Sequence, residues 1–418
     1  MAARRALTLE SSRLFVWVWL PGQNVPVVAG ALDQVGDRVV FTYGRSYRQR
    51  ADAASLYEPE LPLRRGVIEP RGGLAEPGCI RDAGPDAWGQ RVILARTTQG
   101  SLNAASDTAD LGLLTYLRQS DSDRIGALDF QDSATIYVPR GAPATLEDMQ
   151  TAAEQLQAGR FLAPELSAAL QHGTSIGGAR PKAVLTSGNR SLIAKFSSTT
   201  DPYPVIKAEG VAMDLARRVG LDVAGSEVIE CLGKDVLLVE RFDRAPGGTR
   251  RMVVSALTIL EEQALSAHHL SYPELGDRIR ARFTDPGATM RELFSRIVFN
   301  ICVGNTDDHA RNHSAFWDGT HLTLTPAYDI CPQNRSGTEA NQAMYIDRGQ
   351  TKASRFAVCV GAASHYQLDQ ADAAAIVEHQ VTTINKQWAD AADSARLTEL
   401  ERAQLWGRQI LNPYASST

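Results

Sequence analysis

Residues 305–312 read Asn-Thr-Asp-Asp-His-Ala-Arg-Asn, a short polar block between two apolar segments. Apolar residues at helical spacing precede it over residues 293–303, which predicts a buried helix that ends at Gly304. The alternating run 321–325 follows the block and predicts a strand that leads to Asp329. The fold is therefore expected to hold this polar block between a core helix and a strand.

The block has the spacing of a phosphotransferase site. Asp307 and Asn312 form the pattern D-x-x-x-x-N, and Asp329 supplies a further acid. In kinases one Asp of such a set orients the acceptor hydroxyl and takes its proton, while an Asn and a second Asp hold Mg²⁺ against the phosphates of ATP. The alternative is a polar loop in which Asp307 caps a helix and Asn312 closes a turn, and this motif alone does not exclude it.

Composition places the chain among ordinary globular proteins. The 418 residues suggest two or three domains, and 44% of them are hydrophobic and 22% charged. A formal net charge of -5 argues against a strongly basic nucleic-acid binder. The five cysteines form no C-x-x-C pair, so a reducing cytoplasm is expected. The N-terminal residues lack a long apolar run, so we expect no signal peptide and no contact with a membrane.

The order of predicted elements indicates an α+β protein in three parts. Residues 1–125 are expected to form a β-rich subdomain with a helical connection, residues 126–244 a second part rich in strands, and residues 245–418 a mainly helical part. Strands are predicted at 14–20, 25–32, 38–43, 191–196, 226–230 and 235–240, and helices at 88–97, 107–117, 145–156, 164–171, 206–219, 371–387 and 397–411.

Lys195 lies between apolar neighbours on one of these strands, and the helix predicted after it carries Glu209. A lysine in a buried strand needs a partner, and kinases pair such a phosphate-binding lysine with a helix glutamate. A lysine with its head in water and a glutamate favoured by the helix dipole are the alternatives for the two residues taken separately. Their order along the chain favours the functional interpretation.

Two further segments complete a candidate nucleotide site. The small, glycine-rich stretch 172–183 contains Ser175, Gly177 and Gly178; such a backbone approaches phosphates closely, although a flexible turn is an equal alternative. The strand 235–240 leads into a charged segment whose backbone, from Glu240 to Phe242, is placed to meet an adenine, and Asp243 is placed to reach a ribose. A strand end with a surface charge cluster is the alternative there. His309 and Arg311, inside the polar block, are expected to support the catalytic acid.

Taken together, these segments resemble the HipA family of bacterial toxin kinases over nearly the full length of the chain. The resemblance rests on the N-terminal β module and on segments 123–128, 175–182, 239–244, 307–312 and 328–329, together with Lys195. It implies a protein-kinase-like fold of two lobes that uses ATP and Mg²⁺. Asp307 would orient the substrate hydroxyl, Asn312 and Asp329 would bind Mg²⁺, and Lys195 would bind the ATP phosphates.

The resemblance also implies regulation and partners. Ser175 matches a serine whose autophosphorylation inactivates family members. The expected partners are a small helix-turn-helix antitoxin of the HipB type, operator DNA bound through that antitoxin, and a protein substrate such as an aminoacyl-tRNA synthetase. Asp308 departs from the family, which most often has Gly there; the extra carboxylate is expected to add a metal contact or to lie in solvent. Two alternative functions remain: a small-molecule or lipid kinase on the same fold, and a mainly regulatory partner in a DNA complex.

Overall fold

The computed structural model describes residues 12–97, 107–141, 144–160, 166, 169–170, 180–198, 200–335 and 337–417. Its contacts divide the chain into two compact units. Unit 1 comprises residues 1–191, 243–253 and 317–320, and unit 2 comprises residues 192–242, 254–316 and 321–418. The three-part division expected from the sequence, with boundaries after residues 125 and 244, stays a prediction.

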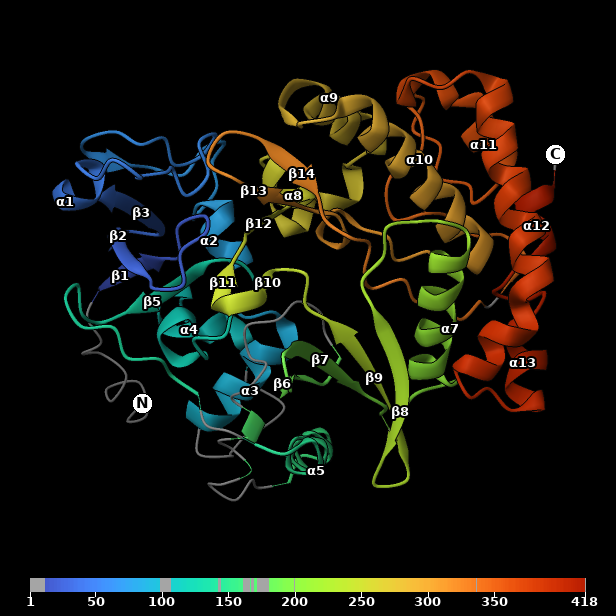
Figure 1. Ribbon diagram of the computed structural model, residues 1–418, viewed down its shortest axis with the longest axis horizontal. Helices are drawn as coiled ribbons and strands as arrows, with labels where there is room; N and C mark the ends of the chain where they lie inside the picture. The colour runs from blue at the N-terminus through green and yellow to red at the C-terminus, as the bar shows by residue number, and fades with distance from the viewer. Residues whose placement is uncertain are drawn as a thin grey trace. The chain divides into compact units, whose positions relative to one another are not determined.

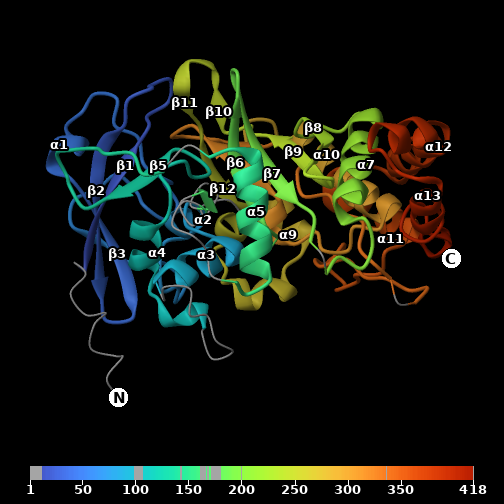
Figure 2. The same cartoon turned by 90° about the horizontal axis from the view of Figure 1, so that it is seen from below.

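Unit 1 is built on a five-stranded antiparallel sheet in the order β4-β3-β2-β1-β5 (Figure 2). The central strands are rich in β-branched and aromatic residues, which suit a pleated surface packed on a core. The tight turn between Val35 and Arg38 lies at Gly36, whose φ of 61° suits glycine. The strands are β1 (Arg13–Val18), β2 (Val27–Val35), β3 (Arg38–Tyr43), β4 (Val67–Ile68) and β5 (Leu128–Gln131).

Short helices accompany this sheet, and α4 packs against β1 and β5. The helix predicted at 107–117 is instead a 3-10 turn, Thr108–Asp110, followed by α4, because Gly112 starts a new helix in extended geometry. Most of the predicted helix 164–171 lies outside the described residues. The remaining elements of unit 1 are α1 (Arg45–Arg48), α2 (Gly78–Asp82), α3 (Ala87–Thr97), α4 (Leu113–Gln119), α5 (Leu146–Gln157), β6 (Lys182–Ser187), β10 (Arg244–Ala245) and β11 (Thr249–Arg250).

Unit 2 begins with three antiparallel strands side by side in the order β7-β9-β8 and with helix α7 packed on β8 and β9. The helix approaches the sheet closely at Gly210, where an added Cβ would lie 2.4 Å from Val228 Cγ2. The preceding residue, Glu209, is buried as well, so its carboxylate is held within the packing of α7. The elements are β7 (Arg190–Phe196), α7 (Val205–Arg218), β8 (Ser226–Cys231) and β9 (Lys234–Glu240).

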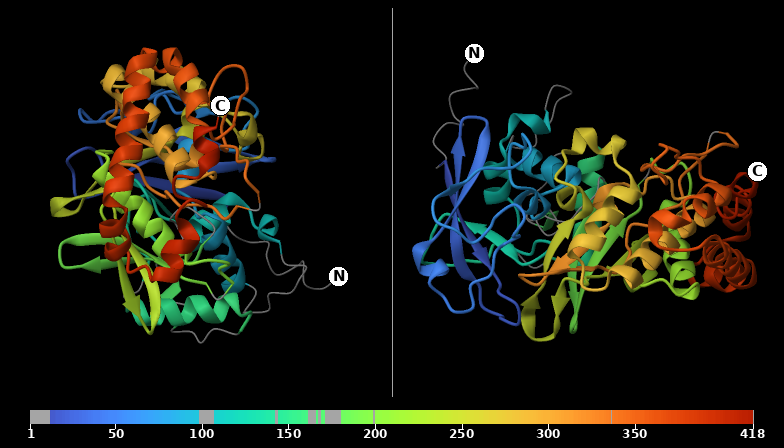
Figure 3. Two further views of the ribbon diagram at one scale, coloured as in Figure 1. Left: turned by 90° about the vertical axis from the view of Figure 1, so that its right-hand side faces the viewer. Right: turned by 90° about the horizontal axis from the view of Figure 1, so that it is seen from above.

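The rest of unit 2 is mainly helical, and α10 lies at its core, with eleven of its residues buried. The long helix α12 packs along both α7 and α10 (Figures 1 and 3). The helices are α8 (Ala256–Ile259), α9 (Tyr272–Arg282), α10 (Pro286–Val303), α11 (Phe356–Gly361), α12 (Gln370–Ser394) and α13 (Glu399–Leu405). Strand β14 (Leu322–Leu324) lies within unit 2. Strands β12 (Met252–Ser255) and β13 (Ser314–Trp317) each have residues in both units.

The helix predicted at 397–411 is wrong in its second half. The structure ends α13 at Leu405, and the chain then turns at Gly407 and Leu411, whose φ angles are 72° and 48°. Pro413, which cannot continue a helix, follows shortly after. The rings of Trp388 and Trp406 pack together, with centroids 5.1 Å apart.

Candidate active site

Lys195 forms the centre of the candidate site in unit 2. It lies on β7 between buried Ala194 and Phe196, and its Nζ is 2.5 Å from Glu209 Oε1 and 2.5 Å from Asp329 Oδ1. The structure therefore brings together three residues that are far apart in the sequence and that we predicted for the site. Burial lowers the pKa of the Lys195 ammonium, but the charges of Asp329 and Glu209 outweigh it and raise the pKa above its usual value.

The two carboxylates at Lys195 differ in exposure. The Glu209 side chain is 3% exposed and is held by the packing of α7, whereas the Asp329 side chain is 38% exposed. Asp329 also has a φ of 59°, in the left-handed region that non-glycine residues seldom adopt. Such backbone strain gathers at functional sites.

The polar block follows α10 as predicted. The helix ends at Gly304, whose φ is 69° and whose missing side chain is required because a Cβ would lie 2.7 Å from the carbonyl oxygen of Gln409. The next residue, Asn305, is buried and donates from Nδ2 to Asn300 Oδ1 at 2.9 Å. The block thus leaves the core helix in a defined direction.

Asp307 is exposed at the surface of the block, and the loop closes around its backbone carbonyl. The His309 N–H and Asn312 Nδ2 both donate to Asp307 O, at 2.8 and 3.1 Å. Because the amide nitrogen of Asn312 is used in this way, its Oδ1 is the atom suited to a metal ion. Desolvation raises the pKa of Asp307; His309 and Arg311 oppose the shift, and the Asp329 carboxylate adds to it.

The expectation that Asp308 lies in solvent is wrong, whereas a metal contact stays a prediction. Asp308 is 4% exposed, and its Oδ2 accepts hydrogen bonds from Tyr272 OH at 2.6 Å and from His313 Nε2 at 2.9 Å. The physical reason is that a buried carboxylate must be satisfied by donors, and these two side chains supply them. The sequence gave no sign of Tyr272, which lies 36 residues upstream on α9.

Tyr328 is a second residue to which the sequence assigned no role in the site. Its hydroxyl donates to the carbonyl oxygen of Arg311 at 2.7 Å and lies 2.6 Å from Ser314 Oγ. Its ring is 5.5 Å from the ring of Phe242, the predicted adenine-contact residue. Tyr328 therefore ties the residue before Asp329 to the end of the polar block.

The other predicted nucleotide residues have mixed outcomes. The Glu240 N–H donates to Gly225 O at 2.7 Å, so this donor is already used within unit 2. Asp243 belongs to unit 1, is 1% exposed, and accepts from the Gly126 N–H and from Arg244 Nη1, both at 2.7 Å. Contact with a ribose would require this buried arrangement to open. Ser175, Gly177 and Gly178 lie outside the described residues.

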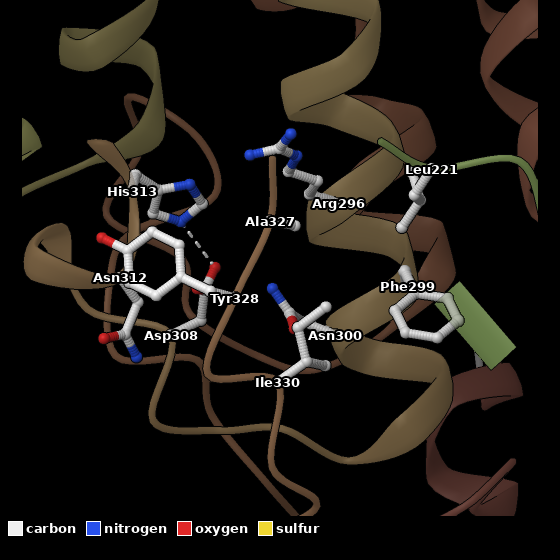
Figure 4. Close-up of a pocket in the computed structure, with 10 residues that line it drawn as sticks. All are labelled: Leu221, Arg296, Phe299, Asn300, Asp308, Asn312, His313, Ala327, Tyr328 and Ile330. Carbon is white, nitrogen blue, oxygen red and sulfur yellow. Dashed lines mark hydrogen bonds and ion pairs between the residues drawn. The ribbon is translucent and has the colours of Figure 1, made fainter. Parts of the chain in front are cut away.

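A small pocket lies beside the polar block (Figure 4), lined by Leu221, Arg296, Phe299, Asn300, Asp308, Asn312, His313, Ala327, Tyr328 and Ile330. Its free space is on the scale of a water molecule rather than of a nucleotide. Lys195, Asp307 and Asp329 are not among its lining residues. The pocket is therefore too small for a nucleotide, although the predicted metal ligand Asn312 is among its lining residues.

The donors of the site fit magnesium and a phosphorylated nucleotide. Asp307, Asp329 and Asn312 offer carboxylate and amide oxygens, which are the hard ligands that Mg²⁺ accepts, and Lys195 offers a cation for phosphate. In the described part of the chain no three His, Cys, Asp or Glu side chains are grouped to hold a metal. Within the same described residues, none of the helices is long and apolar enough to cross a membrane.

Comparison with known proteins places the chain in a family. Residues 174–388 match the family model described as "HipA-like C-terminal domain", which is more than half of the chain. The chain belongs to this family. The structure is also similar to a chain of the Shewanella oneidensis MR-1 toxin–antitoxin complex of HipA, HipB and operator DNA, with a TM-score of 0.65, 18% identity, and coverage of 96% of this chain and 100% of the other. The predicted α+β, protein-kinase-like fold is thereby confirmed.

Curated relatives of this HipA-family chain include kinases and toxins. It is 30% identical to a putative kinase, Y4mE, of Sinorhizobium fredii over 33% of each chain. It is 27% identical to the toxin YjjJ of Escherichia coli over 71% of this chain and 65% of the relative, and 26% identical to the serine/threonine-protein kinase toxin HipA of Shewanella oneidensis over 33% and 37%. The alignments thus span from a third to just under two thirds of these relatives.

Proposed function

We propose that this chain is an ATP-dependent serine/threonine protein kinase that acts as a toxin. The observation that carries the proposal is the contact of Lys195 with both Glu209 and Asp329 in the unit that also holds Asp307 and Asn312. Lysine, helix glutamate, metal-binding aspartate and catalytic aspartate are the parts that phosphoryl transfer requires. The names of the relatives, which include kinases and a kinase toxin, support the same reading.

Each residue has a definite role in this proposal. Lys195, oriented by Glu209, binds the nucleotide phosphates, and Asn312 and Asp329 hold Mg²⁺, which neutralises charge on the transferred phosphoryl group when it is bound. The exposed Asp307 accepts the proton of the substrate hydroxyl, and its raised pKa suits a base that must pick up a proton. Asp329 is the more exposed of the two carboxylates that contact Lys195, so it is the one of the two that would hold the ion.

Regulation and partners extend the proposal. Ser175 is the expected site of inactivating autophosphorylation, and a HipB-like antitoxin that carries operator DNA is the expected partner. The Shewanella chain of similar fold comes from a complex with HipB and operator DNA, which supports this expectation. The substrate is a protein hydroxyl, with an aminoacyl-tRNA synthetase as the leading candidate, and growth arrest is the expected outcome of expression.

Phosphoryl transfer is tested with the purified chain and radiolabelled Mg-ATP. We expect self-labelling that maps to Ser175, and we expect Asp307→Asn to lower the rate by about 10²- to 10⁴-fold while nucleotide binding persists, because its role is in proton transfer. Asp390→Asn is the matched control: its side chain is 75% exposed, far from the polar block in sequence, and should label like the wild type. A wild-type chain that binds no ATP, or an Asp307→Asn variant that labels normally, would overturn the proposal.

A further inference from the structure

Asp308 is the meeting point of three elements of unit 2. Its Oδ2 is bonded to Tyr272 on α9 and to His313, the residue before β13, while Asp308 itself follows α10 (Figure 4 shows the His313 bond). Tyr272 OH also lies 3.2 Å from the backbone carbonyl of Asp308. The side chains of all three are at most 5% exposed, so the contacts form inside the core.

Both partners of Asp308 are themselves held by backbone bonds. Tyr272 opens α9, whose first turn is closed by the capping box of Ser271 and Glu274, and the Tyr272 N–H donates to Tyr345 O at 2.9 Å. The carbonyl of His313 accepts from the Ala256 N–H at 2.7 Å. The hydroxyl and the imidazole therefore approach Asp308 from fixed positions, which makes the carboxylate an anchor and not a mobile side chain.

The anchor is adjacent to the proposed catalytic base. Asp307 is exposed whereas Asp308 is buried, so the two neighbouring side chains leave the backbone toward opposite environments. Holding the Asp308 carboxylate in the core consequently fixes the backbone from which the Asp307 carboxylate projects. Two other side chains also hold the backbone of Asp307: Asn312 Nδ2 donates to its carbonyl oxygen at 3.1 Å, and Asn305 Oδ1 accepts from its N–H at 3.4 Å.

We propose that Asp308 is a positioning residue that, through Tyr272 and His313, holds Asp307 in the geometry for proton transfer. The inference rests on the proposed function, in which Asp307 is the base. The Oδ2 atom of Asp308 is occupied by these two donors in the core. Burial raises the pKa of Asp308, but the interaction with His313 and the hydrogen bonds from His313 and Tyr272 outweigh it and lower the pKa, so the anchor is an anion.

The kinetic test compares Tyr272→Phe and Asp308→Asn with Tyr366→Phe. Tyr366 is the matched control because it is as fully buried as Tyr272 but donates to a backbone carbonyl, that of Ile346, at 2.6 Å. We expect each of the two anchor variants to lower kcat for phosphoryl transfer by about 10- to 100-fold, since small misplacements of a catalytic group have effects of that order. KM for ATP should stay within about twofold, because ATP binding does not use the anchor.

The double variant Tyr272→Phe/Asp308→Asn sharpens the same test. If the two residues act as one device, its kcat should fall little beyond that of the worse single variant. If the loss of any buried tyrosine hydroxyl impaired folding, the control Tyr366→Phe would also have a smaller active fraction. An unchanged kcat in Tyr272→Phe, or a control that loses as much kcat, overturns the proposal.

Hydrogen exchange measured by mass spectrometry separates this inference from the proposed function. Amides of the segment 305–313 should exchange faster in Tyr272→Phe than in the wild type, while peptides of β7 and α7 stay unchanged. If the wild type transfers no phosphoryl group, the proposed function fails, yet faster exchange confined to 305–313 still supports the anchor. Unchanged exchange in that segment overturns the anchor whatever the activity.

Discussion

Asp129 in unit 1 and Asp308 in unit 2 are both buried carboxylates, but they are stabilised in different ways. Asp129 is bonded to Arg124 Nε at 2.8 Å and to Arg140 Nη2 at 2.9 Å, with the Arg124 and Asp129 side chains 0% exposed. Asp308 is instead bonded to a tyrosine and a histidine. Arginine carries a permanent charge, whereas a tyrosine hydroxyl donates a hydrogen bond without one.

The difference distinguishes a structural network from one that lies beside the proposed reaction site. Around Asp129 the cations of two arginines balance the buried anion, and Gln131 Nε2 donates to it as well, at 2.8 Å. Around Asp308 no arginine or lysine is bonded to the carboxylate in the described structure, and its charge is one of the causes that raise the pKa of the neighbouring Asp307. A negative charge retained at this place favours a base and attracts a cation.

The largest change in the free energy of unfolding is expected when the network around Asp129 in unit 1 is broken. Arg124→Met should lower the free energy of unfolding by about 3–5 kcal/mol, because it leaves the Asp129 carboxylate buried beside a missing cation. Urea unfolding, with hydrogen exchange of β1 and β5 to localise the loss, measures it. Arg118→Met is the control: its partner Asp132 is 65% exposed, so about 0–1 kcal/mol is expected. Equal losses in the two variants would refute the distinction.

A smaller effect is expected from the hydroxyl that holds Asp308. Tyr272→Phe removes a hydrogen bond to a charged group and should lower the free energy of unfolding by about 1.5–3 kcal/mol, whereas Tyr366→Phe removes one to a neutral carbonyl and should lower it by about 0.5–1.5 kcal/mol. The same urea titrations measure both. If Tyr366→Phe lowers the free energy of unfolding more than Tyr272→Phe does, the charge of Asp308 does not strengthen its hydrogen bond from Tyr272.

The smallest and broadest effect is on pH dependence. Burial raises the pKa of Asp129, but the charges of Arg124 and Arg140 outweigh it and lower the pKa below that of an ordinary aspartate. A carboxyl with a depressed pKa in the folded state contributes stability above its unfolded pKa, and that stability is lost as the pH falls through the folded pKa. Wild-type stability should therefore decrease below about pH 4.

The variant Asp129→Asn tests the origin of this acid sensitivity. It should be less stable than the wild type at pH 7, since two arginines lose their partner, but its stability should change less between pH 5 and pH 3. Unfolding free energies at several pH values, obtained with urea, give the comparison. If the free energy of unfolding of the variant changes with pH as steeply as that of the wild type, Asp129 does not account for the acid sensitivity.

Much of the candidate site could be predicted from the sequence because its parts carry local signals. A lysine inside an apolar strand, a glutamate on the next helix and a D-x-x-x-x-N block after a helix are each visible in short windows, and the structure brings Lys195, Glu209 and Asp329 together. The network of Asp308 has no such signal. Tyr272 looks like an ordinary first-turn aromatic, and only the packing of α9 brings it to the polar block.

The expectation that Asp308 lies in solvent failed for a related reason. A carboxylate next to a catalytic acid looks solvent-exposed or metal-bound when neighbouring side chains are unknown, and whether it is buried depends on the donors that the tertiary structure supplies. The helix predicted at 397–411 failed because apolar spacing continued past Leu405, whereas the backbone turned at Gly407.

The sequence by itself determined the order of the kinase-like elements, the end of α10 at Gly304 and the identity of the residues around Lys195, because periodicity, glycine and charge act over a few neighbours. Tertiary structure decided which of two adjacent aspartates faces solvent. Asp307 is exposed and Asp308 is buried because Tyr272 and His313, from separate elements, converge on the second carboxylate and satisfy its charge in the core.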